Sequence, residues 1–188
     1  MTLFEALTVA RQQIDRLDAR LLLQYATGCS HTDLLARPET PVIAPAYAQF
    51  AEWVARRAAG EPLAYLVGEA EFRGRVFQVS PAVLIPRPET EVLIDLVLSK
   101  LNGLASPRVL ELGTGSGIIA ISLALECPAA QVVTVDVSNE AIFLARNNAG
   151  RLGAKVDCRV GDWFAPVVGE QFDLIVSNPP YVAEGDPH

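Results

Sequence analysis

Apolar residues recur at intervals of three and four positions through the first third of the chain, from Thr2 to about Leu66. This spacing places them on one side of a helix, so it predicts amphipathic helices that each bury one face. Gly28 is suited to end one of these helices, and Gly60 to end another that spans about 46–59. We therefore expect residues 1–70 to form a small helical domain.

The pattern changes to a shorter period at Glu71–Val79, where the sequence reads EFRGRVFQV. Apolar residues on each side of Arg73–Gly74–Arg75 predict two short strands joined by a glycine turn. This β-hairpin is expected to form a linker over residues 71–85. A helix with acidic residues in its first turn and Lys100 in its last is expected at about 91–101.

Beyond residue 86, apolar runs rich in β-branched residues alternate with helical stretches. Strands are expected at 108–112, 132–136, 156–160 and 172–177, with helices at 117–126 and 139–152 between the first three. Such alternation is typical of a parallel sheet covered on both faces. The predicted fold is therefore α/β, in which the helical domain and hairpin precede a partial, doubly wound, Rossmann-like sheet over residues 86–188.

The composition is that of a folded, acidic chain. Hydrophobic residues make up 51% and charged residues 20% of the sequence, and the net charge is −7; this balance argues against disorder. Proteins that neutralise a phosphate backbone draw on clustered Lys and Arg. Only Arg56–Arg57 and the group Arg73, Arg75 and Arg87 are locally basic, and ordinary surface charge explains them equally well. We therefore expect no direct binding to nucleic acid.

Cysteine and histidine usage and the N-terminus narrow the classes further. The three cysteines have no CxxC spacing and there are only two histidines, so neither a disulfide framework nor a metal site is predicted. No apolar run approaches the ~20 residues that a membrane helix needs. The N-terminal segment is charged throughout and lacks the apolar core of a signal peptide. These features predict a cytoplasmic protein without a membrane segment.

The stretch VLELGTGSG (109–117) combines a strand with a glycine-rich turn and the start of a helix. Its glycines lack Cβ atoms, so the backbone can fold tightly and lie against a ligand at the helix N-terminus. The spacing G-x-G-x-G differs from the G-x-G-x-x-G of dinucleotide-binding folds, which weakens a pyrophosphate interpretation. The alternative interpretation of this stretch is a tight turn between strand and helix that binds no ligand. The loop residues expected to contact a cofactor are Gly113, Thr114, Gly115, Ser116 and Gly117.

Two further residues extend this candidate cofactor site. Asp136 ends the strand QVVTVD, at about the distance from the glycine loop where doubly wound folds place a carboxylate that binds ribose hydroxyls. Trp163 follows Asp162 after the third expected strand. An acid and an aromatic ring at this edge could bind an adenine amine and cover its face, although Trp163 could also be a core residue.

The segment Ser177–Tyr181, with the sequence SNPPY, follows the strand FDLIV and is the most specific motif. Pro179 and Pro180 fix the backbone and remove N–H donors, so nearby carbonyl groups are held rigidly. The side-chain oxygen of Asn178 and the backbone oxygen of Pro179 could then accept both hydrogens of an NH₂ group. Such acceptors favour an arrangement in which the nitrogen lone pair faces an electrophilic methyl group. Tyr181 would supply a flat apolar wall; a simple Pro-Pro turn is the alternative.

These motifs resemble the class I S-adenosylmethionine-dependent methyltransferases, and more narrowly the HemK-type release-factor glutamine methyltransferases. The narrower resemblance lies in GEPLAYLVGEAEFRGRVFQVSPAVLIPRPETE (60–91), followed by LELGTGSG and NPPY. It implies S-adenosyl-L-methionine as cofactor and methylation of the glutamine amide in the GGQ motif of peptide-chain release factors. It also implies a helical domain that docks the release factor. We expect the protein to be a monomer.

The resemblance assigns roles to individual residues. The residues from Gly113 to Gly117, with Asp136, Trp163 and Asn178, would contact the cofactor. Asn178, Pro179, Pro180 and Tyr181 would hold the glutamine, and Asn178, Pro179 and Tyr181 would serve catalysis. Glu111 and Thr90 are expected as further neighbours of the cofactor.

The sequence departs from the family pattern in the number of strands. The family's catalytic domain has a seven-stranded sheet, whereas four strands are expected here before His188. A sheet that ends at a central strand exposes a hydrophobic edge and lacks one wall of the substrate cleft. We therefore expect a fragment with little activity of its own.

Other functions are compatible with parts of the sequence. The NPPY motif also suits DNA or RNA amino-methyltransferases, but the acidic charge and the lack of a basic recognition segment favour a protein substrate. A non-catalytic module that binds a partner through the same fold is a second alternative. NAD-dependent redox chemistry is disfavoured by the glycine spacing.

Overall fold

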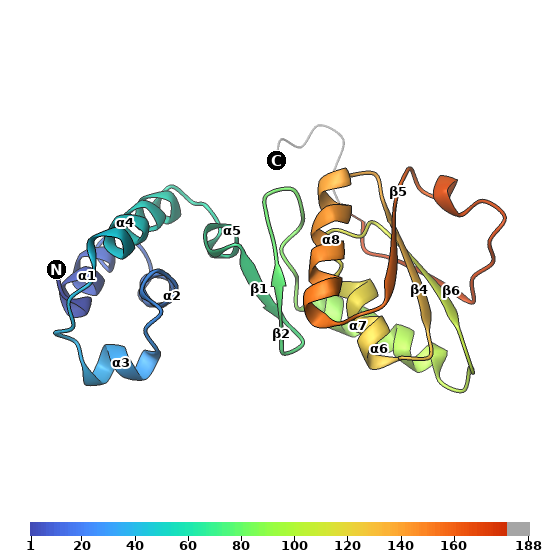
Figure 1. Cartoon of the computed structure of the whole chain (residues 1–188), viewed down its shortest axis with the longest axis horizontal. Helices are drawn as coiled ribbons and strands as arrows, with labels where there is room; N and C mark the ends of the chain where they lie inside the picture. The colour runs from blue at the N-terminus through green and yellow to red at the C-terminus, as the bar shows by residue number, and fades with distance from the viewer. Residues whose placement is uncertain (180–188) are drawn as a thin grey trace. The chain divides into compact units, whose positions relative to one another are not determined.

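The computed structural model describes residues 1–179 of the chain. The chain forms two compact units, Met1–Gly68 and Glu69–His188. The first unit is helical, and the second contains a β-hairpin and a parallel sheet with its helices (Figure 1). Among the described residues, no helix is long and apolar enough to cross a membrane.

The first unit contains five short helices, as its three-and-four spacing predicts. They are α1 (Leu3–Ala10), α2 (Arg16–Thr27), α3 (His31–Ala36), α4 (Ala44–Ala58) and α5 (Leu63–Val67). Local chemistry sets their ends: Thr2 and Glu5 form a capping box at α1, and Gly28 ends α2 in the left-handed conformation. Helix α2 packs against α1, α4 and α5, and its Leu22 and Leu23 are completely buried. Helix α5 was not predicted separately.

The predicted hairpin is confirmed as β1 (Glu69–Phe72) paired antiparallel with β2 (Arg75–Gln78). Arg73 and Gly74 form its turn with φ values of 49° and 69°. Two consecutive positive φ angles are typical of a two-residue hairpin turn, because this twist matches that of the strands. Arg73 and Arg75 both form ion pairs with Glu126 of the same unit, at 2.7 and 2.8 Å.

The main sheet has four parallel strands in the order β5-β4-β3-β6. These are β3 (Arg108–Leu112), β4 (Gln131–Asp136), β5 (Val156–Val160) and β6 (Leu174–Ser177), within two residues of the predicted bounds. Helices α7 (Ile118–Glu126) and α8 (Asn139–Leu152) connect the first three strands, and α6 (Glu89–Leu101) precedes them. Since β4 and β6 lie on opposite sides of β3, the chain changes direction there, which in open α/β sheets creates a ligand crevice at the strands' carboxyl ends.

One face of the sheet is covered by the three helices. Val109, Val132 and Val176 on this face form one core with Ile94 of α6, the apolar residues of α7, and Ala149 of α8. Ile121 and Leu123 of α7 are completely buried, which explains why α7 reads as an apolar run rather than as an amphipathic helix.

The opposite face has a different cover among the described residues. Leu110, Val133 and neighbouring side chains pack there against Val167 of the short 3₁₀ helix η1 (Ala165–Val167) and against Phe172. Helices on both faces were expected, but in the part described here this face is covered by the segment between β5 and β6. Ile175 of β6 also belongs to this face and is half exposed.

Candidate functional site

A cleft of about 380 Å³ opens at the carboxyl ends of β3, β4 and β6. It lies where the sheet changes direction, at the position expected of a ligand site in this fold class. A smaller cavity of about 40 Å³ lies beside it and shares Leu84, Gly113, Gly115 and Asn178 with it. Predicted site residues that line the larger cleft are Gly113, Gly115, Asp136, Trp163, Asn178 and Pro179.

The glycine loop between β3 and α7 forms part of the cleft wall, through Gly113 and Gly115. Gly113 and Gly115 have φ values of 82° and 52°, and a Cβ on either would meet no other atom within 4 Å. Their backbone therefore faces open space and is accessible to a ligand. Thr114 and Ser116 are buried and line the smaller cavity. The Ser116 Oγ atom has no hydrogen-bond partner among the described residues.

Gly117 occupies a different environment from the other two glycines. It has a φ of 84° and lies against α8, where a Cβ would approach the Ala145 Cβ atom to 3.1 Å and the Ile121 Cδ1 atom to 2.9 Å. It lines neither cavity. Its position indicates that glycine is required here for the close approach of α7 and α8.

Asp136 ends β4 and lies between the glycine loop and the start of α8. Its Oδ2 atom accepts a hydrogen bond from the Gly115 N–H at 3.0 Å, and its Oδ1 atom accepts one from the Ser138 N–H at 2.9 Å. The carboxylate thus fixes both loops. Each carboxylate oxygen has a further lone pair, so the group can also accept hydrogen bonds from a ligand in the cleft.

Trp163 follows β5, which among the described strands is the edge strand at the other end of the sheet from β6. Its side chain is 60% exposed, so it is not a core residue, which removes the structural alternative raised by the sequence. Its φ of 44° is unusual for a residue with a bulky side chain. Gly161 precedes it, and the Gly161 N–H donates to the Asp136 carbonyl oxygen at 2.9 Å.

Asn178 and Pro179 follow β6 and also line the cleft. The Asn178 Nδ2 atom donates to Thr90 Oγ1 at 3.3 Å. With Nδ2 engaged by α6, the amide oxygen of Asn178 is directed away from Thr90. Pro180 and Tyr181, the other two residues of the predicted substrate motif, lie outside the described residues.

Glu111, an expected neighbour of the cofactor, lies on β3 beneath α7 and next to the smaller cavity. It is 1% exposed, and burial raises the pKa of its carboxyl group to about 8, against the effect of hydrogen bonds from Thr134 and the Ala120 N–H. Thr134 Oγ1 lies 2.7 Å from Glu111 Oε2 and 2.6 Å from Thr114 Oγ1. Glu111 is therefore mostly protonated at neutral pH and connects β3 and β4 with the glycine loop.

Some cleft residues were not identified individually from the sequence. Ala82, Val83 and Leu84, between β2 and α6, form one wall of the cleft. They lie inside the stretch 60–91 that carries the family resemblance, but nothing in their apolar side chains indicates a ligand. Among the described residues, no group of His, Cys, Asp and Glu could hold a metal ion.

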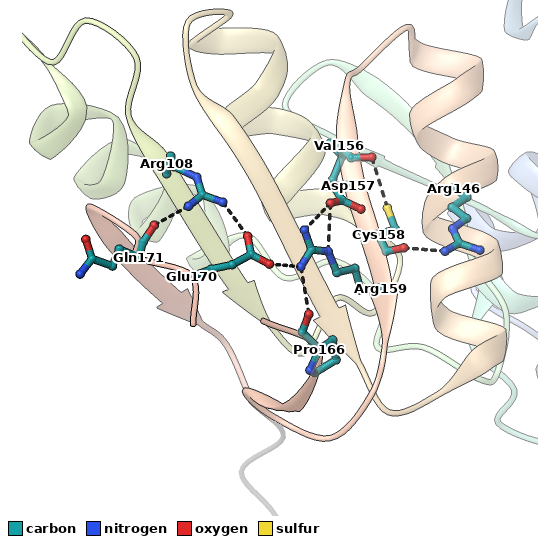
Figure 2. Close-up of polar contacts among 9 residues, drawn as sticks. All are labelled: Arg108, Arg146, Val156, Asp157, Cys158, Arg159, Pro166, Glu170 and Gln171. Carbon is teal, nitrogen blue, oxygen red and sulfur yellow. Dashed lines mark hydrogen bonds and ion pairs between the residues drawn. The ribbon is translucent and has the colours of Figure 1, made fainter. Parts of the chain in front are cut away.

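A network of ion pairs holds the segment that carries Trp163 against the sheet (Figure 2). Glu170 forms ion pairs with both Arg108 of β3 and Arg159 of β5. Arg159 also pairs with Asp157 and donates to the Pro166 carbonyl oxygen at 2.9 Å. Arg108 stacks over the Phe172 ring, with its guanidinium carbon 4.8 Å from the ring centroid. These contacts connect the middle of the loop between β5 and β6, at Pro166, and its C-terminal part, at Glu170 and Phe172, to the sheet.

Comparison with known proteins identifies the class and then the family. Residues 3–68 match the PrmC N-terminal domain, and residues 89–188 match the methyltransferase small domain. A solved 16S rRNA methyltransferase of T. thermophilus, in complex with AdoMet and guanosine, superposes with a TM-score of 0.54 at 26% identity, over 62% of this chain and 33% of that one. The second unit is therefore a Rossmann-like methyltransferase domain.

Curated relatives define the family more narrowly. The release factor glutamine methyltransferase of Bordetella pertussis is 49% identical over 100% of this chain and 70% of its own length. The one from Burkholderia pseudomallei is 48% identical over 93% of this chain and 64% of its own length. The chain belongs to the release factor glutamine methyltransferase family, and it spans about two thirds of the length of these relatives.

Proposed function

We propose that this protein transfers a methyl group from S-adenosyl-L-methionine to the side-chain amide nitrogen of the glutamine in the GGQ motif of peptide-chain release factors. The observation that carries the proposal is the single cleft lined by the glycine loop, by Asp136 and by Asn178 with Pro179. The residues proposed to bind the cofactor and those proposed to accept a planar NH₂ group thus line one cleft, in a chain that belongs to this family.

The residues of the cleft fit the proposed cofactor. No atom lies within 4 Å of a Cβ built on Gly113 or Gly115, so a ligand can approach their backbone without steric hindrance. The buried Ser116 Oγ atom has no hydrogen-bond partner among the described residues and could form a hydrogen bond with the ligand. Asp136 and Trp163 both line the cleft, where Asp136 would accept hydrogen bonds from ribose hydroxyls and Trp163 would cover the adenine ring. When bound, the cofactor supplies an electrophilic methyl group on a sulfonium, which leaves as a neutral thioether.

Asn178 and Pro179 are proposed to hold the glutamine amide. An amide nitrogen is a poor nucleophile because its lone pair is delocalised over the carbonyl group. The Asn178 side-chain oxygen and the Pro179 backbone oxygen would accept the two amide hydrogens and orient the nitrogen toward the methyl group. Positive charge develops on the nitrogen during transfer, so these acceptors bind the transition state more strongly than the ground state.

A protein substrate is favoured over a nucleic acid by the pairing of the basic residues. Arg56 pairs with Glu52 and Glu61, and Arg73 pairs with Asp95 and Glu126. Cations that are already neutralised contribute little to counterion release from a phosphate backbone. We propose that the substrate is the release factor, that it docks on the helical unit of residues 1–70, and that the protein acts as a monomer in the cytoplasm.

The proposal is tested by incubating the full-length gene product, since little activity is expected of residues 1–188 alone, with a release factor and isotope-labelled S-adenosylmethionine, and then locating the methyl group by mass spectrometry. The expected result is a single label on the GGQ glutamine. A release factor in which asparagine replaces that glutamine is the matched control and should remain unlabelled. Label on another residue, or on ribosomal RNA added to the same reaction, would overturn the assignment.

Cofactor binding separates an enzyme from a binding module. Calorimetric titration should detect S-adenosylmethionine binding that is lost in Asp136→Ala. A protein that binds the release factor but shows no affinity for S-adenosylmethionine would instead be a non-catalytic partner.

A further inference from the structure

Asn148 on α8 is a completely buried polar residue outside the cleft. Its Oδ1 atom accepts a hydrogen bond from the Gln78 N–H at 2.7 Å, and its Nδ2 atom donates to the Gln78 carbonyl oxygen at 2.9 Å. The same Nδ2 atom donates to the Ser116 carbonyl oxygen at 2.9 Å. One side-chain amide therefore satisfies three backbone groups from two distant parts of the sequence.

The chemistry of the three partners fixes the orientation of this amide. The Gln78 N–H can only donate and therefore requires the oxygen of Asn148. The carbonyl oxygens of Gln78 and Ser116 can only accept and therefore require its nitrogen. A carboxylate, a hydroxyl or an apolar side chain at position 148 could not form all three bonds.

The two backbone partners belong to, or lead into, two walls of the cleft. Ser116 belongs to the glycine loop, whose Gly113 and Gly115 line the cleft. Gln78 ends β2 and lies four positions before Ala82, the first residue of the wall formed by Ala82, Val83 and Leu84. Asn148 thus links the glycine loop to the segment that leads into this second wall.

We propose that Asn148 is a positioning residue that sets the separation of these two walls and thereby the affinity for S-adenosylmethionine. The cofactor part of this inference rests on the proposed function. Asn148 does not line the cleft, so it would act only through Ser116 and Gln78. Ala145 lies about one helical turn before Asn148 and packs closely against Gly117. This contact also holds α8 against the glycine loop, which supports a positioning role for this part of α8.

Two variants test the proposal with different chemistry at one position. Asn148→Asp keeps the shape of the side chain but places a second oxygen opposite the Gln78 and Ser116 carbonyl oxygens, and Asn148→Ser removes most of the contacts. We expect the dissociation constant for S-adenosylmethionine to rise about tenfold or more in Asn148→Asp, because buried groups lose their partners. Calorimetry is performed below the unfolding temperature of every variant.

Val97→Ala is the matched control for a loss of stability alone. Val97 is buried in the same unit, on α6, and does not line the cleft. It should lower the unfolding temperature while changing the dissociation constant less than about twofold, since Val97 lines neither cavity. An Asn148 variant that loses as much stability as Val97→Ala but binds the cofactor normally would overturn the proposal.

Hydrogen exchange distinguishes failure of this inference from failure of the proposed function. In the ligand-free protein, Asn148→Asp should speed amide exchange in both 78–84 and 113–117, whereas Val97→Ala should not. If the parent protein does not bind S-adenosylmethionine, the proposed function fails, and this comparison still decides whether Asn148 holds the two walls. Unchanged exchange in either segment would contradict the inference.

Discussion

Thr90 Oγ1 accepts a hydrogen bond from Asn178 Nδ2 at 3.3 Å, although the two residues are 88 positions apart. Thr90 lies in the first turn of α6 and is 3% exposed, so its hydroxyl has few alternative partners. The bond occupies the nitrogen end of the Asn178 amide, so its oxygen end can serve as the proposed acceptor for the glutamine. The family resemblance predicts that Thr90 neighbours the cofactor. This hydrogen bond indicates a second role for Thr90, which is to orient the Asn178 amide.

Thr90→Val should therefore impair catalysis more than cofactor binding. Loss of one hydrogen bond that orients Asn178 should lower kcat/KM for the release factor about tenfold, equivalent to roughly 1.4 kcal/mol. The dissociation constant for S-adenosylmethionine should change less than about twofold if the hydroxyl acts only on Asn178. Steady-state kinetics and calorimetry measure the two quantities. Thr90→Ser retains the hydroxyl and should restore kcat/KM, whereas weaker cofactor binding in Thr90→Val would favour direct contact.

Asp136→Ala should abolish most cofactor binding. The carboxylate fixes Gly115 and Ser138 and is proposed to bind ribose hydroxyls, so its removal affects the ligand and two loops together. Hydrogen bonds to charged groups are worth about 1.5–3 kcal/mol each, so we expect at least about a hundredfold weaker binding. Asp136→Asn retains one acceptor oxygen and should bind more tightly than Asp136→Ala. Equal affinities of the parent and both variants, measured by calorimetry, would exclude Asp136 from the site.

Gly117→Ala should destabilise the protein more than Gly153→Ala. Both glycines have positive φ values, 84° and 72°, so alanine is strained at either position. Only at Gly117 would the new methyl group also collide with Ala145 and Ile121, whereas nothing lies within 4 Å at Gly153. We expect losses of about 2–3 kcal/mol and about 1 kcal/mol respectively, from urea denaturation. Equal losses would mean that α7 and α8 separate easily and that their packing does not require glycine at position 117.

The elements of the fold could be predicted because their signals are local. The strand bounds of β3 and β5 and the helix bounds of α8 follow directly from apolar periodicity and capping residues. The end of β6 is also local, but its start is not. Asp173 exchanges backbone and side-chain hydrogen bonds with Arg108, 65 positions away, and the ladder begins only at Leu174.

The candidate site was only partly predictable, because some of its residues are defined by contacts between distant positions in the sequence. Gly113, Gly115 and Asp136 belong to motifs whose spacing has a physical meaning in this fold. Asn148 carries no such signal, because an asparagine in a helix is ordinarily read as a surface residue, and only its pairing with Gln78 and Ser116 reveals a role. Contacts made across 70 and 32 positions cannot be inferred from periodicity.

Glu111 should make the stability of the protein fall as the pH rises. Its folded pKa is about 8, against an ordinary value of 4.5, because burial disfavours the carboxylate. Between these values the folded state binds a proton that the unfolded state has released, so stability is full below pH 4.5 and is lost as the pH rises toward 8. The decline is at most about 1.4 kcal/mol per pH unit. The glutamine in Glu111→Gln cannot ionise, so the free energy of unfolding of this variant, measured by urea denaturation, should not show this decline. Parallel pH profiles of the parent and the variant would contradict the prediction.

Glu170 should have the opposite pH dependence, because its carboxylate is partly exposed and paired rather than buried and neutral. Hydrogen bonds from Arg159 and then Arg108 lower the pKa of its carboxyl below the ordinary 4.5. The folded state therefore gains stability above that value and loses it as the pH falls through the lowered pKa.

The consequence of this pairing should be local. At neutral pH, Glu170→Gln removes the charge that joins β3 and β5 to the loop between β5 and β6 (Figure 2), so amide exchange should speed up in 161–171 and remain unchanged in α6. Because Trp163 lies in this loop and lines the cleft, S-adenosylmethionine should bind more weakly as well. Glu52→Gln removes an exposed partner of Arg56 in the other unit and is the matched control, with no expected effect on the loop. Normal exchange and affinity in Glu170→Gln would show that packing of Val167 and Phe172 against the sheet is sufficient to position Trp163.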